Sequence, residues 1–174
     1  VAAVLVVEAK PPSGAIFTTT PDGGIVNENV HYDLKREVYL DGGPPPNAPQ
    51  TAAGLDDGWY VFQVTDPSGH YLLSMDPSKC RVFEVEEGII VRQVLPSEFG
   101  LLNTYSYGNG KKAVDIPCHI ADPPTPPDPA GPDDYGPSGQ HDTNVDVDHG
   151  ADGAIVVQLM PYGTTPNPGG VYKA

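Results

Sequence analysis

Seven residues at positions 58–64, Gly-Trp-Tyr-Val-Phe-Gln-Val, constrain the fold of this chain more than any other stretch. Large side chains at every second position are typical of a half-buried strand, and they place Tyr60 and Phe62 on one face. Residues 66–69, Asp-Pro-Ser-Gly, carry the residue types that a type I turn favours. Because residues 70–75 return as a second apolar stretch, the sequence predicts a β-hairpin.

Further strands are predicted around this hairpin, and no window of the sequence shows apolar residues at helical spacing over three turns. The 21 prolines and 20 glycines among 174 residues are assigned to turns and extended connections. Strands are predicted over residues 14–20, 25–32, 37–40, 81–85, 89–94, 101–107, 112–120, 142–148 and 154–160. Short strands at this spacing favour an all-β fold, a β-sandwich. We expect most of its core to come from Trp59, Tyr60, Phe62, Val64, Leu72, Phe83, Ile90, Ile155, Val157 and Leu159.

The chain divides into a short leading segment and one domain. Residues 1–10 contain the most hydrophobic run of the sequence, which is far shorter than the about 20 residues that span a bilayer. Its β-branched residues predict an N-terminal extension strand that is apolar on both faces. Residues 11–14, Pro-Pro-Ser-Gly, form a stiff linker, and residues 15–174 form the sandwich domain. Within it, residues 121–140 contain seven prolines and predict an exposed polyproline II excursion.

The extension strand is the candidate subunit interface, since its apolar side chains need cover. The residues concerned are Val1, Ala3, Val4, Leu5, Val6 and Val7. Two interpretations remain open. The segment is either the first strand of its own sheet, or a donor strand that completes the sheet of a neighbouring copy. Because the second contact does not close on itself, it would build a linear filament, a homopolymer.

The charge distribution excludes some partners and suggests one ligand. A net charge of −14 argues against nucleic acid and anionic membrane surfaces, which need a basic patch. Between residues 113 and 172 there is no Lys or Arg but nine Asp. The simplest interpretation of this acidic stretch is a solubilising surface. The best metal candidate is the alternating run of residues 142–148. A strand there would place oxygen ligands suited to Ca²⁺ on one face: Asp142, Asn144, Asp146 and Asp148. The alternative is a solvated strand face, and no other cofactor is expected.

Two cysteines, Cys80 and Cys118, allow a single intramolecular disulfide. Closing that loop would stabilise the fold by roughly 3–4 kcal/mol. The alternative is a pair of buried thiols in a reducing compartment. The disulfide is favoured, and it predicts an extracellular or cell-surface location. Thr125, among prolines, is a candidate for O-glycosylation, so glycans are possible partners.

The sequence shows no arrangement typical of catalysis. The five histidines do not form a His-x-x-x-His or His-Glu-x-x-His motif, and no serine has a Gly-x-Ser-x-Gly or Ser-x-x-Lys context. We therefore expect a protein that is not an enzyme.

Residues 54–64 followed by Pro-Ser-Gly at 67–69 resemble the prealbumin-like domains of bacterial surface proteins, those of the collagen-adhesin B type. That family carries a Leu-x-x-Gly-x-Tyr-x-x-x-Val strand before a turn with proline, and the likeness covers about thirty residues. The family's isopeptide Lys and Asn have no matching positions here. Residues 165–173 also resemble secreted bacterial proteins built on the same domain.

The resemblance implies an extracellular structural module with an Ig-like or prealbumin-like fold. The organisation, with a doubly apolar strand ahead of the domain, is similar to that of subunits of bacterial fibres joined by donor-strand complementation. The expected function is a structural subunit of an extracellular filament or surface fibre. The alternative is a calcium-dependent adhesin or a carbohydrate-binding surface module.

Overall fold

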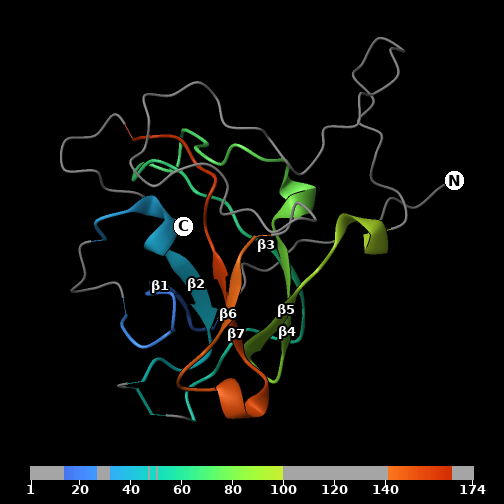
Figure 1. The fold of residues 1–174 in the computed structure, drawn as a ribbon. Helices are drawn as coiled ribbons and strands as arrows, with labels where there is room; N and C mark the ends of the chain where they lie inside the picture. The colour runs from blue at the N-terminus through green and yellow to red at the C-terminus, as the bar shows by residue number, and fades with distance from the viewer. Residues whose placement is uncertain (1–13, 27–31, 47, 50, 100–140, 166–174) are drawn as a thin grey trace, which may run out of the picture.

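The computed structural model describes residues 14–26, 32–46, 48–49, 51–99 and 141–165, and the structural statements below refer to these residues. They form short strands and 3-10 turns, with no α-helix in this part of the chain (Figure 1). The all-β prediction is thereby confirmed. The elements are β1 (Ile16–Thr19), η2 (Lys35–Glu37), β2 (Tyr39–Gly42), β3 (Gly58–Val61), η3 (Ser78–Cys80), β4 (Val82–Glu86), β5 (Ile89–Gln93), η4 (Pro96–Phe99), β6 (Thr143–Val145), η5 (Gly150–Asp152) and β7 (Ile155–Gln158).

The strands form two antiparallel sheets. One has the order β1-β2-β7-β6 and the other the order β3-β4-β5. Both sheets contribute to one hydrophobic core, whose buried members are Leu40, Leu55, Phe62, Val64, Phe83, Val85, Ile90, Val157, Leu159 and Tyr162. Six of the ten predicted core residues belong to this set, and Tyr60 and Ile155 pack against it while partly exposed.

Two predicted core residues are not in the core. Trp59 is 47% exposed and Leu72 is 62% exposed. β3 alternates as the sequence predicts, but only one of its faces packs on the core, so Trp59 points outward. Leu72 lies in residues 70–75, which form two isolated bridges, Thr65 to Leu72 and Ser74 to Tyr162, rather than a strand.

The predicted hairpin is present next to its turn, where the backbone N–H groups of Asp66 and Leu73 donate to the carbonyl oxygens of Tyr71 and Val64, but it does not extend along β3. The Asp66 carboxylate accepts hydrogen bonds from the backbone N–H groups of Ser68, His70 and Tyr71, as expected of Asp at the start of a turn. β3, however, pairs with β4, which offers four consecutive partners from Val82 to Val85.

The predicted pair over residues 81–85 and 89–94 is confirmed as β4 and β5. Glu87 and Gly88, with φ of 51° and 89°, form the two-residue left-handed turn that suits the twist of a hairpin. Other boundaries differ from the prediction. β2 continues to Gly42, beyond the strand predicted over residues 37–40, and β6 ends at Val145, before the end of the strand predicted over residues 142–148. Residues 1–10, 11–13 and 121–140, like the strands predicted at 101–107 and 112–120, lie outside the described residues.

Candidate functional site

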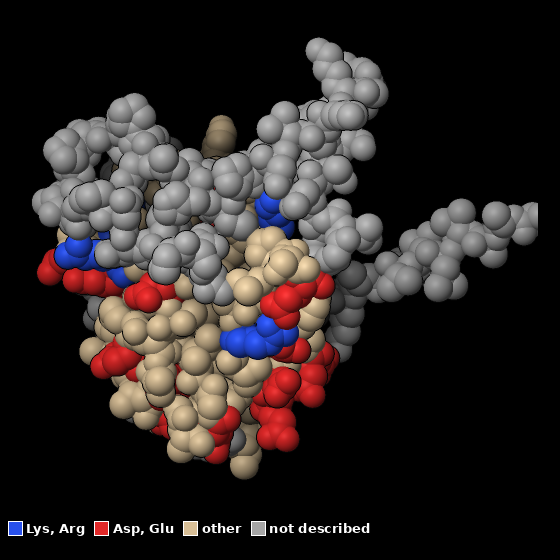
Figure 2. Space-filling model, turned by 45° about the vertical axis from the view of Figure 1, so that its right-hand side comes forward, with Lys and Arg blue, Asp and Glu red and all other residues tan. Residues whose placement is uncertain are grey.

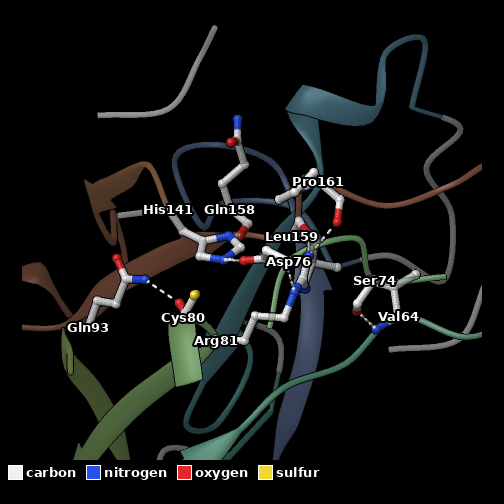
Figure 3. A network of polar contacts seen from close by, with 10 residues as sticks. All are labelled: Val64, Ser74, Asp76, Cys80, Arg81, Gln93, His141, Gln158, Leu159 and Pro161. Atoms are coloured by element: carbon white, nitrogen blue, oxygen red, sulfur yellow. Dashed lines mark hydrogen bonds and ion pairs between the residues drawn. The ribbon is translucent and has the colours of Figure 1, made fainter. Parts of the chain in front are cut away.

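The most polar part of the interior is a network around Arg81, which is fully buried (Figure 3). Its Nε donates a hydrogen bond to Oδ1 of Asp76, and its Nη2 donates to the carbonyl oxygens of Leu159 and Pro161. Cationic carbon Cζ also lies 5.0 Å from the centre of the Phe62 ring. Arg81 thus ties the start of β4 to the chain that follows β7.

His141 completes this network from the segment before β6. Its Nδ1 lies 2.8 Å from the carbonyl oxygen of Gln158, and its Nε2 lies 2.9 Å from Oδ2 of Asp76. The side chain is only 1% exposed. An Asp–His pair can serve as a catalytic dyad, but only if one ring nitrogen can reach a reacting group. Here both nitrogens face protein acceptors, so the geometry suits a structural role for His141.

A second buried polar cluster lies at the other end of β7. Asp41 of β2 and Asp146, just after β6, are 2% and 1% exposed. Asp146 accepts hydrogen bonds from the backbone N–H groups of Asp148 and His149 and from Nδ1 of His149, at 3.0, 2.9 and 3.1 Å. Asp41 accepts one from the N–H of Gly42 at 2.7 Å. Burial, with the nearby Asp146 charge as the next cause, raises the pKa of Asp41 to about 8.

The turn of residues 20–25 closes over these two carboxylates. A Cβ placed on Gly23 would lie 2.2 Å from Oδ1 of Asp146 and 3.3 Å from Oδ2 of Asp41. The φ of Gly23 is +79°, so glycine is favoured here on both steric and conformational grounds. The backbone carbonyl of Asp22 accepts a hydrogen bond from the N–H of Val147 at 2.8 Å. The turn is thereby joined to the residues that follow β6.

A surface groove of about 460 Å³ runs between this turn and β6, and we call it the β6 groove. It is lined by Thr20, Pro21, Asp22, Ile25, Asn144 and Val145. Three apolar side chains at or beside it are largely exposed: Ile25 at 51%, Val145 at 69% and Val147 at 67%. Exposed aliphatic side chains that gather in this way are typical of a surface that binds another chain.

The outer face of the second sheet is different in character. Trp59 and Val61, 47% and 56% exposed, alternate along β3 with side chains that face the core. Glu84 lies opposite Trp59 in the register, and its carboxylate pairs with Arg92, which also binds Glu98. Figure 2 shows that acidic side chains are spread over the lower part of the visible face, with few basic ones among them.

Of the four predicted calcium ligands, only Asn144 lies in a strand, because β6 spans only Thr143–Val145. Oδ2 of Asp142 accepts a hydrogen bond from the Tyr39 hydroxyl at 2.7 Å, while Asp146 turns into the interior. In the described part of the chain, no three His, Cys, Asp or Glu side chains gather as a metal ion would require. Calcium binding itself stays a prediction.

The other predicted site residues lie mostly outside the described residues. This holds for the interface set Val1, Ala3, Val4, Leu5, Val6 and Val7, for Cys118 and for Thr125. Cys80 is buried at the end of η3, and its carbonyl oxygen accepts a hydrogen bond from the Gln93 amide at 2.9 Å. Its pairing with Cys118 stays a prediction.

No protein-family model, curated protein or solved structure matches this chain significantly. The resemblance to prealbumin-like surface domains therefore also stays a prediction. Among the described residues, no helix has the length and apolar character needed to cross a membrane.

Proposed function

We propose that this chain is a structural subunit of an extracellular filament or surface fibre. In this proposal residues 15–174 form an Ig-like or prealbumin-like β-sandwich, and residues 1–10 insert as a donor strand into the neighbouring subunit. Each subunit then donates one strand and accepts another, so the contacts run head to tail and extend a linear homopolymer.

The open edge at β6 is the observation that carries this proposal. β6 is the last strand of the four-stranded sheet, and within the described residues no strand pairs with its far side. Such an edge offers backbone N–H and C=O groups to an added strand. The strand is short and the exposed Asp142 precedes it, two features that limit pairing at an edge, but Val145 on the edge strand itself is 69% exposed.

Residues 1–9 have the composition that a donor strand needs. They contain four valines and one leucine, and burying each of these side chains is worth roughly 1.5–3 kcal/mol. An apolar segment of this kind is not stable in water and requires cover from its own domain or from a neighbour. The stiff Pro11-Pro12 pair disfavours a tight return to its own sheet.

Electron microscopy and light scattering of the intact chain test the proposal. We expect linear filaments from the intact chain, and a folded monomer when residues 1–10 are deleted. If the intact chain is instead a monomer and the deletion unfolds it, the segment belongs to its own sheet and the filament proposal is wrong.

The outer face of β3, β4 and β5 favours a second candidate function, a carbohydrate-binding surface module. Trp59 is half exposed there, beside the charged pair of Glu84 and Arg92. A sugar ring can stack on an exposed indole and bind the neighbouring charged groups. Since Trp59 is the single tryptophan, its fluorescence reports directly on such binding. Soluble glycans that leave the emission unchanged would remove this candidate, and calorimetric titration with Ca²⁺ tests its calcium-dependent form.

A further inference from the structure

We infer that the β6 groove is the acceptor site for residues 1–9 of a second copy of this chain. This inference rests on the proposed function, because it names the surface on which the donor strand binds. It assigns a partner of stated chemistry, a strand that is apolar on both faces, to a groove of about 460 Å³.

The pairing of the strands favours β6 over the opposite edge of the same sheet. The outer side of β1 already carries two bridges, from Thr19 to Val26 and from Ala15 to Gly54. β6 itself has no such bridge within the described ranges, and Asn144 and Val145 both border the groove. The edge is occupied only beyond β6, where the N–H of Val147 donates a hydrogen bond to the carbonyl oxygen of Asp22. An added strand can therefore bond to the β6 backbone and bury its side chains in the same place.

The groove fits a strand with two apolar faces. Val145 of β6 and Pro21 and Ile25 of the turn line the groove, so a strand bound in it meets aliphatic side chains from two elements. An ordinary edge strand has one polar face, which would leave one of these apolar surfaces uncovered. Residues 1–9 are apolar at odd and even positions alike over the first seven residues.

The rim of the groove is acidic, since Asp22 lines the groove and Asp148 is exposed just after Val147, while no Lys or Arg lines it. The apolar run of the donor segment ends at Val7 and is followed by Glu8 and Lys10, whose side-chain charges are opposite. We therefore expect assembly to rest on the burial of apolar side chains and to depend little on added salt.

A pair of matched valine variants in the full chain tests the inference. Val145→Asp places a charge on the β6 groove, and Val61→Asp places one on the other sheet, at a similarly exposed residue of the edge strand β3. We expect Val145→Asp to lower filament mass by at least about tenfold, as for a central interface residue, and Val61→Asp to leave it unchanged. Equal assembly of both variants and the unaltered chain would overturn the inference. Circular dichroism of the two variants verifies that both are folded.

Photo-cross-linking gives a second readout that does not depend on these variants. With p-benzoylphenylalanine in place of Val147, we expect irradiation to join two chains, with residues 1–10 of one copy in the cross-linked peptide. A cross-link to residues 1–10 within a single chain would show that the segment covers its own edge, and a cross-link to any other segment would name another occupant. Both results would overturn the inference.

The two proposals fail in different ways. If the unaltered chain forms no filaments at any concentration, the proposed function is wrong. A labelled synthetic peptide of residues 1–10, added to the full chain that carries the cross-linker at position 147, then still tests the groove. If filaments form but Val145→Asp has no effect and no cross-link joins position 147 to residues 1–10, the acceptor lies elsewhere and the filament function stands.

Discussion

The two ends of β7 hold buried charges in opposite ways. Beyond its last residue, the positive charge of Arg81 is buried against the Asp76 carboxylate and backbone carbonyl oxygens. Before its first residue, the carboxylates of Asp41 and Asp146 are buried close to each other, with the turn of residues 20–25 closed over them. The first arrangement places opposite charges together, and the second places like charges together.

This difference shows that the sign of the neighbouring charge, and not burial alone, decides how a buried ionisable group affects stability. A buried cation with a carboxylate and carbonyl partners is satisfied, and it becomes costly only when a partner is removed. Two buried carboxylates favour protonation of one of them, so their end of the sheet depends on pH. The β6 groove lies at this second end, since Asp146 sits between Val145 and Val147.

Breaking the opposite-charge end should have the largest effect. Arg81→Met keeps much of the side-chain volume but leaves the Asp76 carboxylate buried without its cation. We expect the free energy of unfolding to fall by about 3–5 kcal/mol, as for other broken buried ion pairs. Chemical denaturation monitored by circular dichroism measures it.

Arg92→Met is the matched control, because Arg92 also pairs with two carboxylates but its side chain is 42% exposed. A loss of less than about 1 kcal/mol is expected there. If both variants lose the same free energy of unfolding, the buried Arg81 network does not stabilise the fold more than an exposed ion pair does.

The like-charge end should show a pH dependence that Asp41→Asn removes. The unfolded chain releases the Asp41 proton near the ordinary pKa of 3.8, whereas the folded chain holds it until about 8. The free energy of unfolding therefore decreases as pH rises between these values, by up to about 1.4 kcal/mol per pH unit, and the decrease ends above the folded pKa. Asn cannot ionise, so the variant should be more stable than the natural chain at neutral pH and nearly equal to it below about pH 4.

Asp22→Asn provides a control of opposite sign. Hydrogen bonds from the Thr20 hydroxyl and the Gly24 N–H lower the pKa of Asp22, so its carboxylate stabilises the fold above the unfolded pKa and stops doing so as pH falls through the folded value. Thermal unfolding measured from acid to mildly alkaline pH separates the two variants. An Asp41→Asn curve parallel to that of the natural chain would refute the buried acid pair.

Adding a single methyl group tests how tightly the turn closes over the acid pair. In Gly23→Ala the new Cβ would lie 2.2 Å from Oδ1 of Asp146, and the φ of +79° is unfavourable for alanine as well. Gly153→Ala has the unfavourable φ, at +92°, but not the steric clash, since nothing lies within 4 Å of a Cβ there. We expect about 1 kcal/mol of destabilisation at Gly153 and about 1–3 kcal/mol more at Gly23. Equal losses in denaturant unfolding would mean that the turn is not closed over Asp146.

Features set by neighbours in the sequence could be predicted, and those set by distant residues could not. The turn begun by Asp66 and the β4–β5 pair follow from local turn chemistry and alternation, and both are present. Alternation also placed Trp59 and Tyr60 on opposite faces of one strand correctly. It did not show that only one of these faces is covered, because that depends on which face of β3 packs on the core.

The charged residues of the interior were the hardest to predict. Asp76 and His141 are 65 residues apart, and no local pattern marks them as partners. Asp41 lies beyond the strand predicted over residues 37–40 and precedes Gly-Gly-Pro-Pro-Pro, yet β2 continues through it. Asp146 was recognised as a candidate ligand or as part of a solvated strand face, but the structure has the opposite face inward, with Asp146 buried and its neighbours Val145 and Val147 exposed.

The last comparison is between two histidines, one at each end of β7. The His149 side chain is 14% exposed, and its Nδ1 donates one of the three hydrogen bonds that Asp146 accepts. The His141 side chain is 1% exposed, and both its ring nitrogens contact buried acceptors. His149→Ala leaves two backbone donors on Asp146, so we expect a loss of about 1 kcal/mol in the free energy of unfolding. His141→Ala removes both contacts and the T-shaped packing on Phe62 at 4.9 Å, so about 2–4 kcal/mol is expected. Denaturant unfolding of both variants at one pH measures the difference. A larger loss for His149 than for His141 would mean that the acid pair, and not the Arg81 network, is the stronger support of β7.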